Sequence, residues 1–386
     1  MTLLLSSQNV GEYLVKLGLC TPSDQHTLKI DPLAAKNFNL SVSFPDGRKL
    51  LVKQERHNQE GKTAGEFLQE WRIQEFLQQF PEQKHLSSFL PSVLNFDREH
   101  SILVFSYLDN YRDLADFYGK ENIFPPEIAS AIGTNLASIH RATFNNQDYQ
   151  KFFNENIEDK QANMVPSFIH SLERITPEIF GFVPTDGLKF FALYQRYDSL
   201  GQAIAQLGNA FIPCCVTHND LKLNNILLYK DWEHSQDRIV RLIDWERCAW
   251  GDPAFDLGML IASYLQVWLG SLVISQALTI EESLRLANSP LDAIQPAIAA
   301  LSIAYLENFP EILQHRSDFW RRVVQFSGLA LIQQIQAMIQ YQKSFGNAGI
   351  CMLQVAKSLL CRPEPSMTTV FGTAATVLNQ ANFSVA

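Results

Sequence analysis

The most informative part of this chain is residues 216–258, which read VTHNDLKLNNILLYK at 216–230 and RIVRLIDWERCAWGDPAFDLG at 238–258. Three polar residues, His218, Asp220 and Asn225, follow the pattern His-x-Asp-x-x-x-x-Asn. Asp244 comes 19 residues after Asn225, directly after an apolar run. This spacing is typical of the loop in which kinases transfer a phosphoryl group.

The residue types fit that chemistry. A hydroxyl that attacks a γ-phosphate needs a carboxylate to orient it and accept its proton, and Asp220 is predicted to be this base. Magnesium prefers hard oxygen ligands, which the Asn225 amide and the Asp244 carboxylate would supply. His218 is grouped with these catalytic-loop residues, but we expect it to pack and hydrogen-bond the loop rather than carry protons.

Two short strands are expected between the predicted metal ligands. Ile226–Tyr229 and Ile239–Ile243 are mostly apolar, and the polar run Lys230–Arg238 between them reads as a turn. A hairpin of this kind would return Asp244 to the neighbourhood of Asn225, so that both could face one ion.

A plainer alternative is that the three motif residues are ordinary polar residues at the end of a strand, because so short a pattern also arises by chance. Two linked features at the expected distances favour the kinase interpretation. One is Asp244 after its apolar run, and the other is the segment Gly251–Asp256, GDPAFD.

The motifs resemble those of the aminoglycoside phosphotransferase and choline kinase family. Its members carry a His-Gly-Asp loop, an Ile-Asp-Trp/Phe-Glu segment and a Gly-Asp-Pro-x-x-Asp-Leu run. This chain has HNDLKLNN, IDWE and GDPAFDLG, with Asn219 where the family usually has glycine. The resemblance implies an α+β, bilobal protein-kinase-like fold, with a small antiparallel-sheet N-lobe and a larger, mainly helical C-lobe.

The resemblance also implies roles for individual residues. Asp220 would be the catalytic base, and Asn225 and Asp244 would hold the metal. Asp252 and Asp256 would organise the loop and the helix behind the site.

A small antiparallel sheet is predicted near the N-terminus. His26–Ile30 and Phe38–Phe44 alternate apolar and polar residues, and Pro45–Arg48 has turn composition. Lys49–Gln54 reads as the returning strand. Lys53 lies on it, as a kinase lysine must to contact the α and β phosphates of ATP.

A helix is predicted over Thr63–Phe80, and one of its glutamates should pair with Lys53 to hold it over the phosphates. The resemblance favours Glu70 for this role, because helices of that family carry their glutamate just before an apolar stripe of the kind that follows Glu70 here. Glu66 and Glu75, about one turn away, remain competitors.

The loop before the second strand departs from the usual pattern. Residues Asp31–Asn37 read DPLAAKN, where phosphate-cradling loops usually carry glycines. Without glycine the backbone cannot approach phosphates as freely. Three alternatives stay open: Lys36 or Asn37 contributes instead, nucleotide affinity is weaker, or the loop has a different shape.

A hinge is predicted after the apolar strand Ser101–Leu108. Backbone groups near Ser106, Tyr107 and Leu108 would meet the adenine there, and Asp109-Asn110 marks the boundary by its turn composition.

Two lobes are therefore expected. Residues 1–108 would form the nucleotide-covering N-lobe, and residues 109–386 the C-lobe with the catalytic loop, metal site and acceptor pocket. Residues 363–386 contain Pro-Glu-Pro and many small polar residues, so we expect a loosely held tail. Acidic residues of an irregular insert, Glu155, Glu158 and Asp159, are possible acceptor contacts or a solvated surface.

Composition limits the possible partners and location. The chain has 386 residues and a formal net charge of −9, which argues against a role in nucleic-acid binding. Its six cysteines form no Cys-x-x-Cys pair and have no histidine at zinc-finger spacing. We expect reduced, mostly buried thiols in a cytoplasmic protein.

One stretch raises the question of a membrane. Leu257–Ile274 has 18 residues without a charge, the length at which a spanning helix becomes a candidate. Asp256 opens it, however, and no basic residue follows until Arg285, so the usual basic flank is missing. The N-terminus, MTLLLSSQNV, also lacks the basic region and long apolar core of a signal peptide. We expect a buried helix and no membrane association.

These features predict a kinase that uses ATP and Mg²⁺ to phosphorylate a hydroxyl of a small molecule. Seven residues separate Asp244 from Asp252, which leaves no long activation segment, and no Ala-Pro-Glu element follows. A peptide would therefore not dock in the manner of protein kinases.

Two alternatives stay open. Lys222, two residues after Asp220, matches the lysine with which eukaryotic Ser/Thr protein kinases contact the γ-phosphate. This keeps a peptide or protein kinase possible, for instance one acting on a precursor peptide in natural-product biosynthesis. The missing glycine loop would suit a catalytically silent binding module, but retention of the catalytic-loop residues and Lys53 counts against it.

Overall fold

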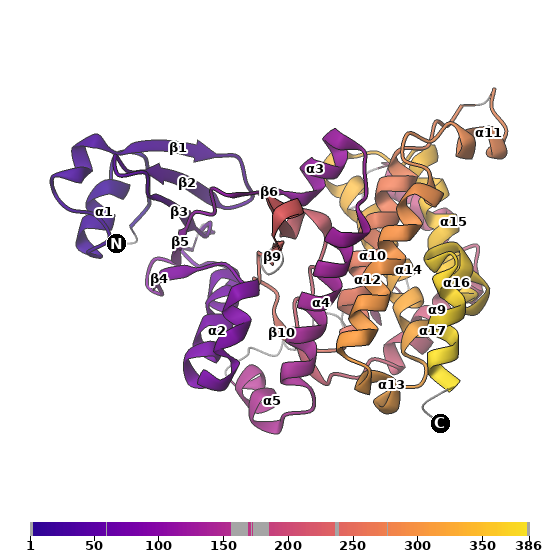
Figure 1. Ribbon diagram of the computed structural model, residues 1–386. Helices are drawn as coiled ribbons and strands as arrows, with labels where there is room; N and C mark the ends of the chain where they lie inside the picture. Colours follow the sequence, from indigo (N-terminus) through magenta and orange to yellow (C-terminus); the bar gives the residue numbers. More distant parts are fainter. Residues whose placement is uncertain are drawn as a thin grey trace. The chain divides into compact units, whose positions relative to one another are not determined.

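The computed structural model describes residues 3–58, 60–155, 169–170, 172, 185–235, 239–275 and 277–383. The chain forms two compact units (Figure 1). The first contains Met1–Arg112 and Leu227–Cys248, and the second contains Asp113–Ile226 and Ala249–Ala386. The predicted α+β class is confirmed, with an antiparallel sheet in the first unit and a mainly helical second unit. The chain returns to the first unit at Leu227 instead of leaving it once after Leu108.

The first unit is built on a five-stranded antiparallel sheet in the order β1-β2-β3-β5-β4. Its strands are β1 Lys29–Leu33, β2 Phe38–Ser43, β3 Lys49–Gln54, β4 Val93–Asp97 and β5 Ile102–Ser106. In β3, Leu50, Val52 and Gln54 are buried on one face, and the alternation of a strand places Lys53 on the other. Lys53 lies opposite Asn39 of β2 and Leu103 of β5.

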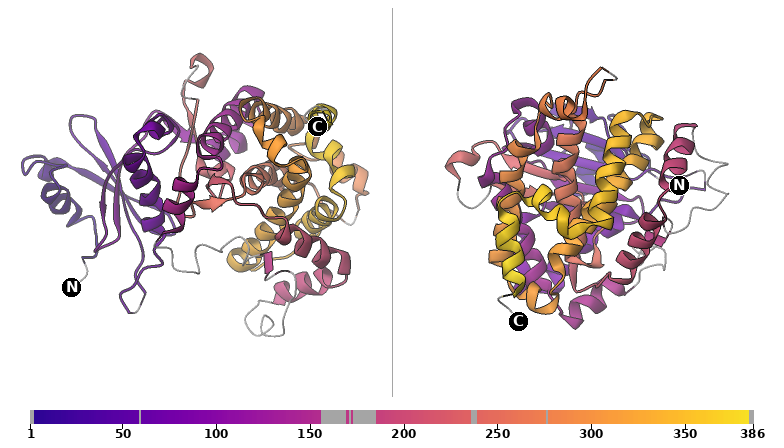
Figure 2. Two further views of the ribbon diagram at one scale, coloured as in Figure 1. Left: turned by 90° about the horizontal axis from the view of Figure 1, so that it is seen from below. Right: turned by 90° about the vertical axis from the view of Figure 1, so that its right-hand side faces the viewer.

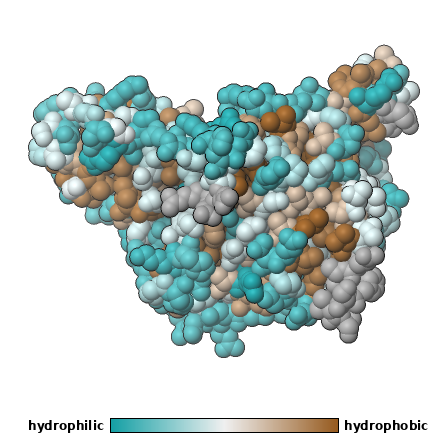
Figure 3. All heavy atoms as spheres, in the orientation of Figure 1, coloured by the Kyte–Doolittle hydropathy of each residue, from teal (hydrophilic) through white to brown (hydrophobic). Residues whose placement is uncertain are grey.

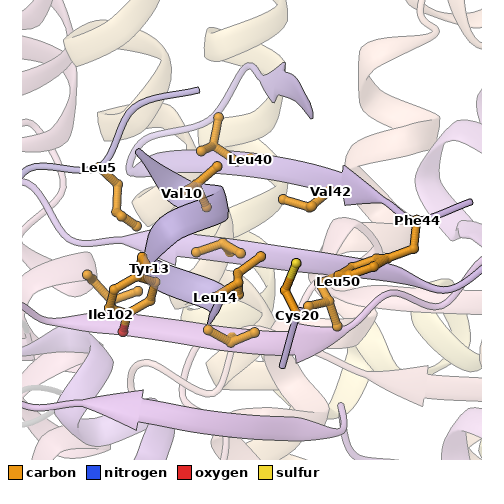
Figure 4. Close-up of a cluster of buried hydrophobic side chains, with 12 residues drawn as sticks. Leu5, Val10, Tyr13, Leu14, Cys20, Leu40, Val42, Phe44, Leu50 and Ile102 are labelled. Atoms are coloured by element: carbon orange, nitrogen blue, oxygen red, sulfur yellow. The ribbon is translucent and has the colours of Figure 1, made fainter. Parts of the chain in front are cut away.

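The N-terminal segment covers the face of the sheet opposite Lys53. Helix α1, Val10–Lys16, lies across the strands, and its apolar side chains point into them (Figure 4). The side chain of Gln54, at the end of β3, binds the backbone of the residues that precede α1. Its Oε1 accepts the Leu5 N–H at 2.8 Å, and its Nε2 donates to the Leu3 carbonyl at 2.7 Å. The cluster on this face comprises Leu5, Val10, Tyr13, Leu14, Cys20, Leu40, Val42, Phe44, Leu50, Val52, Ile102 and Val104.

Helix α2, Glu66–Gln79, belongs to the Lys53 face of the sheet. Its Phe67 packs in one buried cluster with Leu103 and Phe105 of β5. The register of β3 and β5 pairs Lys53 with Leu103 and Leu51 with Phe105. The lysine and α2 therefore share one side of the sheet.

Two strands differ from the prediction. β1 begins three residues later than expected and runs through Pro32, because an edge strand tolerates a residue without an N–H. The loop between β1 and β2 is thereby shortened to Ala34–Asn37. β4 lies between α2 and β5, where no strand was predicted. It is the other edge strand, and its pairing shifts between Val93 and Asn95, which weakens the alternating pattern.

The remaining strands are short. A three-stranded sheet has the order β6-β8-β9, with β6 Tyr111–Asp113, β8 Ile226–Tyr229 and β9 Val240–Leu242. The Tyr229 N–H donates to the Ile239 carbonyl at 2.8 Å, which closes the predicted hairpin. In the second unit β7, Cys215–Thr217, pairs antiparallel with β10, Ala249–Gly251.

The second unit consists mainly of packed helices. α4 lies along α12, and α10 along α14 (Figures 1 and 2). α10 is hydrophobic around most of its circumference and is buried accordingly. The helices are α3 Leu114–Glu121, α4 Pro126–Thr143, α5 Gln147–Asn154, α8 Thr185–Tyr194, α9 Asp198–Asn209, α10 Pro253–Gly270, α11 Ile280–Arg285, α12 Leu291–Asn308, α13 Glu311–His315, α14 Phe319–Ala337 and α15 Asn347–Cys361.

The C-terminal residues form helices where a loosely held tail was expected. α16, Pro363–Phe371, packs against α14 and α12, and α17, Ala374–Phe383, packs against α16 and α12. Phe371 and Leu378 are fully buried. Proline is compatible with the first turn of a helix, so the Pro-Glu-Pro sequence begins α16 instead of interrupting a chain.

Residues 257–270 of the uncharged stretch lie in the buried helix α10, and residues 271–274 follow its end. Over the described residues, no helix combines the length and hydrophobicity needed to cross a membrane. Hydrophobic side chains do reach the surface around α11 (Figure 3), where Leu284 and Leu286 are exposed. All six cysteines are free thiols and four of them are buried, as expected.

The close contact between α4 and α12 predicts opposite effects for two glycine-to-alanine changes. A Cβ on Gly133 of α4 would lie 2.2 Å from the Leu301 carbonyl oxygen, whereas a Cβ on Gly119 of α3 would meet nothing within 4 Å. Alanine gains up to about 1 kcal/mol in helix propensity at either site. We expect Gly133→Ala to lower the free energy of unfolding by about 2 kcal/mol, and Gly119→Ala to leave it unchanged or raise it. Urea titrations followed by circular dichroism measure both, and equal effects would contradict this packing.

Candidate active site

The catalytic loop is anchored by a buried carboxylate. Asp256 of α10 is fully buried, and its two oxygens accept the backbone N–H groups of His218 at 2.6 Å and Asn219 at 2.7 Å. The same carboxylate lies 3.3 Å from Nε2 of His140, whose Nδ1 is 2.9 Å from the Tyr305 hydroxyl. The loop that carries Asp220 is therefore fixed to α4, α10 and α12.

Asn219 explains how this chain manages without the family's glycine. Its φ is +60°, in the left-handed region that glycine adopts freely. Asparagine tolerates this region better than other side chains. The Asn219 Oδ1 also accepts the Thr217 hydroxyl at 3.0 Å. The turn that glycine usually allows is thus kept, with an added side-chain hydrogen bond.

The next residues gather around Asp220. The Lys222 ammonium lies 2.8 Å from Asp220 Oδ2. The Asn225 amide nitrogen donates to the Asp220 backbone carbonyl at 2.8 Å and lies 3.3 Å from Oδ2. His218 is fully buried, and its Nδ1 accepts the Asp220 N–H at 3.3 Å. This contact fits the predicted role of His218 in holding the loop.

Asp252 caps the helix that carries Asp256. Its Oδ1 accepts the Ala254 N–H at 3.0 Å, and its Oδ2 accepts the Ile212 N–H at 3.0 Å. The Arg316 guanidinium donates to the same Oδ2. Burial raises the pKa of Asp252, and the arginine opposes this shift. The buried Asp252 side chain thus caps α10, pairs with Arg316 and binds the backbone at Ile212.

In the first unit, Lys53 lies between two carboxylates. Its Nζ is 2.7 Å from Asp244 Oδ1 and 3.8 Å from Glu70 Oε1. Burial works against the charged ammonium, but the Glu70 and Asp244 carboxylates outweigh it and raise the pKa of Lys53. Asp244 follows β9 and has φ +61°. The structure thus brings Lys53 together with the predicted glutamate and with the aspartate of the IDWE motif.

Glu70 is an unusual carboxylate. Its side chain is almost fully buried, and neither oxygen has a hydrogen-bond partner. Burial raises the pKa of Glu70 to about 7, with Lys53 pulling it down and Asp244 pushing it up. Of the three glutamates considered, Glu70 is the one that lies near Lys53. The other two pair elsewhere, Glu66 with Lys36 and Glu75 with Arg98.

The glycine-free loop between β1 and β2 is held by its lysine. Lys36 pairs with Glu66 at the start of α2, and its Nζ lies 3.9 Å from Glu246 Oε1 of the IDWE motif. Burial raises the pKa of Glu246, and Glu66 adds to the effect. The side chain of Lys36 therefore ties this loop to α2 and to the IDWE motif.

The predicted hinge residues follow β5. Ser106 ends the strand, and the Tyr107 N–H donates to the Lys49 carbonyl at 3.0 Å. The Lys49 ammonium lies 5.6 Å from the centre of the Tyr107 ring and 2.5 Å from Asp109. The Leu108 carbonyl accepts the Tyr111 N–H at 3.0 Å. The hinge backbone is thus partly occupied by contacts of the first unit.

A family model described as "Phosphotransferase enzyme family" matches residues 35–287, well over half of the chain. The chain belongs to this phosphotransferase family. No curated protein sequence matches it. Two solved structures show the same fold. An ethanolamine kinase from Plasmodium vivax is 15% identical with a TM-score of 0.55, over 90% of this chain and 86% of that one. A choline kinase from Cryptosporidium parvum is 12% identical with a TM-score of 0.50, over 98% and 100%.

Several site residues of this phosphotransferase were not predicted. Arg316 is 64 residues from its partner Asp252, and no local pattern indicates the pairing. Glu246 stands inside the IDWE motif, which could have pointed to it. Of the acidic residues suggested for the acceptor, Glu158 and Asp159 lie outside the described residues, and Glu155 is exposed.

The backbone conformation of Asn219 makes a prediction for this phosphotransferase. Asn219→Gly keeps the left-handed conformation and loses one hydrogen bond, so the free energy of unfolding should change by less than about 1 kcal/mol. Asn219→Val places a β-branched side chain at φ +60° and should cost about 2 kcal/mol. Urea unfolding of the two variants checks this, and a valine variant as stable as the glycine variant would contradict it.

The environment of Glu70 predicts a pH dependence. Because the folded-state pKa of about 7 lies above the ordinary value of 4.5, the folded state holds the proton more tightly. Glu70 should therefore make stability fall as pH rises between about 4.5 and 7, by at most about 3 kcal/mol. Glu70→Gln should lack this component. Urea unfolding of both proteins at pH 5 and pH 8 measures the difference, which disappears if Glu70 titrates normally.

Proposed function

We propose that this chain is a kinase that transfers the γ-phosphate of ATP, with Mg²⁺, to a hydroxyl of a small molecule. The observation that carries the proposal is the arrangement on the catalytic loop. The Asp220 carboxylate is held between the Lys222 ammonium and the Asn225 amide. A carboxylate fixed in this way suits a general base.

The proposed reaction assigns Asp220 one defined task. An Asp220 carboxylate oxygen accepts the proton of the acceptor hydroxyl while the hydroxyl oxygen bonds to the γ-phosphorus. The bond from that phosphorus to the oxygen bridging the β-phosphate breaks, and ADP leaves. Lys222 offers a positive charge beside the reacting oxygens, and His218 maintains the loop.

Lys53 and Glu70 are proposed to serve the nucleotide. The Lys53 ammonium would contact the α and β phosphates, with Glu70 supporting it from α2. The Lys53–Asp244 ion pair supports this assignment, because it places a fixed positive charge beside a proposed metal ligand. The backbone of Ser106, Tyr107 and Leu108 would receive the adenine.

Asn225 and Asp244 fit magnesium by their chemistry. The Asn225 amide nitrogen donates to Asp220, so its oxygen is the atom that can serve as a ligand. The described residues contain no group of three or more His, Cys, Asp or Glu side chains suited to a metal. Protein sites often hold magnesium through one or two side chains and the substrate's phosphates, and Asn225 and Asp244 are proposed in that role. The ion would neutralise phosphate charge during transfer.

A small acceptor is favoured by the short link after Asp244. The chain reaches β10 at Ala249 and α10 at Pro253, which leaves no room for an activation segment that docks a peptide. Choline, ethanolamine and aminoglycosides are the first acceptors to test, since the resemblance and the matched structures carry these names.

The test is transfer of labelled γ-phosphate from ATP with Mg²⁺ into three samples: these acceptors, a metabolite extract and a peptide extract. Label in a small molecule supports the proposal. Label on serine or threonine of a peptide would replace it with a peptide kinase. Absence of transfer together with no melting-temperature shift by ATP and Mg²⁺ would indicate a silent binding module.

The matched control is Asp220→Asn, which conserves size and removes the base. We expect turnover to fall about a hundredfold or more, with the affinity for ATP retained. Initial rates and a calorimetric titration with ATP separate the two quantities. A fully active Asp220→Asn variant would refute the assignment of Asp220.

A further inference from the structure

Glu55 is a buried carboxylate of the first unit to which the proposed chemistry gives no role. It directly follows β3, and its side chain is 2% exposed. Its Oε2 accepts the Ser101 hydroxyl at 2.8 Å, and its N–H donates to the Ser101 carbonyl at 3.0 Å. Its two oxygens also accept backbone N–H groups of Glu66 at 3.1 Å and Phe67 at 3.3 Å. The last two donors are the first two residues of α2.

α2 has no N-terminal cap of its own. The residue before it is Gly65, at φ +81°, and no side-chain hydrogen bond from this position caps the helix. The first N–H groups of a helix lack partners within the helix, and a negative charge near them is favourable. Glu55 supplies both the acceptor and the charge. The cap of α2 thus comes from the end of strand β3.

The position of Glu70 depends on where α2 lies. Its carboxylate is buried without a hydrogen-bond partner, 3.8 Å from the Lys53 ammonium. A side chain without hydrogen bonds is positioned mainly by its own backbone. Glu70 follows Glu66 by about one helical turn, and Lys53 precedes Glu55 by two residues. Glu55 therefore connects the strand of Lys53 directly to the turn that leads to Glu70.

Other contacts of α2 are less directional. Phe67 packs on Leu103 and Phe105, and apolar packing permits small displacements. The Cys248 thiol donates to the Gln69 carbonyl at 3.2 Å, which is a weak hydrogen bond.

The ion pairs of Glu66 with Lys36 and of Glu75 with Arg98 run through basic side chains that are more than half exposed. The hydrogen bonds to Glu55 differ from these contacts, because a buried side chain binds the backbone of the helix itself in its first turn.

We propose that Glu55 is a positioning residue for nucleotide binding, which locks α2 to β3 so that Glu70 faces Lys53. α2 is then a fixed helix, in contrast to the mobile helix through which protein kinases are controlled. The inference rests on the proposed function, in which Lys53 contacts the phosphates.

The experiment measures the dissociation constant of ADP with magnesium by calorimetry, and melting by circular dichroism. It compares the wild type with Glu55→Ala, Glu55→Gln and Val42→Ala. Val42 is fully buried on the opposite face of the sheet and serves as a destabilised control. We expect the dissociation constant of ADP to rise about tenfold in Glu55→Ala. It should rise less in Glu55→Gln, because the glutamine amide oxygen can still accept one N–H. Val42→Ala should lower the melting temperature and leave the constant unchanged.

A double-mutant cycle tests whether Glu55 acts through Glu70. In a Glu70→Ala background, Glu55→Ala should have no further effect on ADP affinity. Equal, additive losses in both backgrounds would overturn the proposal, as would unchanged affinity in Glu55→Ala and Glu55→Gln. If the alanine variant fails to fold, the glutamine variant decides. A wild type that binds no ADP would refute the proposed function and this inference with it.

Discussion

The catalytic loop depends on the two oxygens of Asp256. A carboxylate removed from water is costly unless its oxygens are satisfied, and here two successive backbone N–H groups of the loop satisfy them. The buried Asp256 carboxylate therefore restrains the position of the loop, because moving the loop would remove the hydrogen bonds that satisfy the carboxylate. His140 and Tyr305 extend the network, so the position of Asp220 is set by residues from several helices.

The first unit uses charge differently. Its carboxylates Glu66, Glu70, Asp244 and Glu246 outnumber the two lysines among them, Lys36 and Lys53. Such a cluster gains from an added cation, which the magnesium of the proposed nucleotide complex would supply. Both lysines already pair with carboxylates. In the proposed function, a phosphate that binds Lys53 would therefore replace a carboxylate as its partner.

Regular local patterns were readable from the sequence. The boundaries of β2 and β3 follow the alternation of apolar residues, and the catalytic motif identified the family. The edge strand β4 was not predicted, because a bulge breaks its period. α16 was mistaken for a loose tail, since proline in a first helical turn looks like proline in a loop. The partners of Glu55 and Asp252 are set by tertiary folding, which a single sequence does not reveal.

Asn219 also became interpretable only in the structure, which shows its backbone angle. As a replacement for glycine it departs from the motif. Its backbone angle lies in the region that glycine adopts freely, and its side chain accepts a hydrogen bond from Thr217.

The order in which the chain is synthesised has a consequence for folding. The first unit includes Leu227–Cys248, so it cannot be completed until residue 248 has left the ribosome. The second unit buries Leu378, so its packing cannot be completed before that residue has been synthesised. Domains usually fold in turn as they emerge. Here residues 1–112 must wait for residues 113–226 of the other unit before the first unit can close, and we expect apolar surface of its sheet to stay exposed in the meantime.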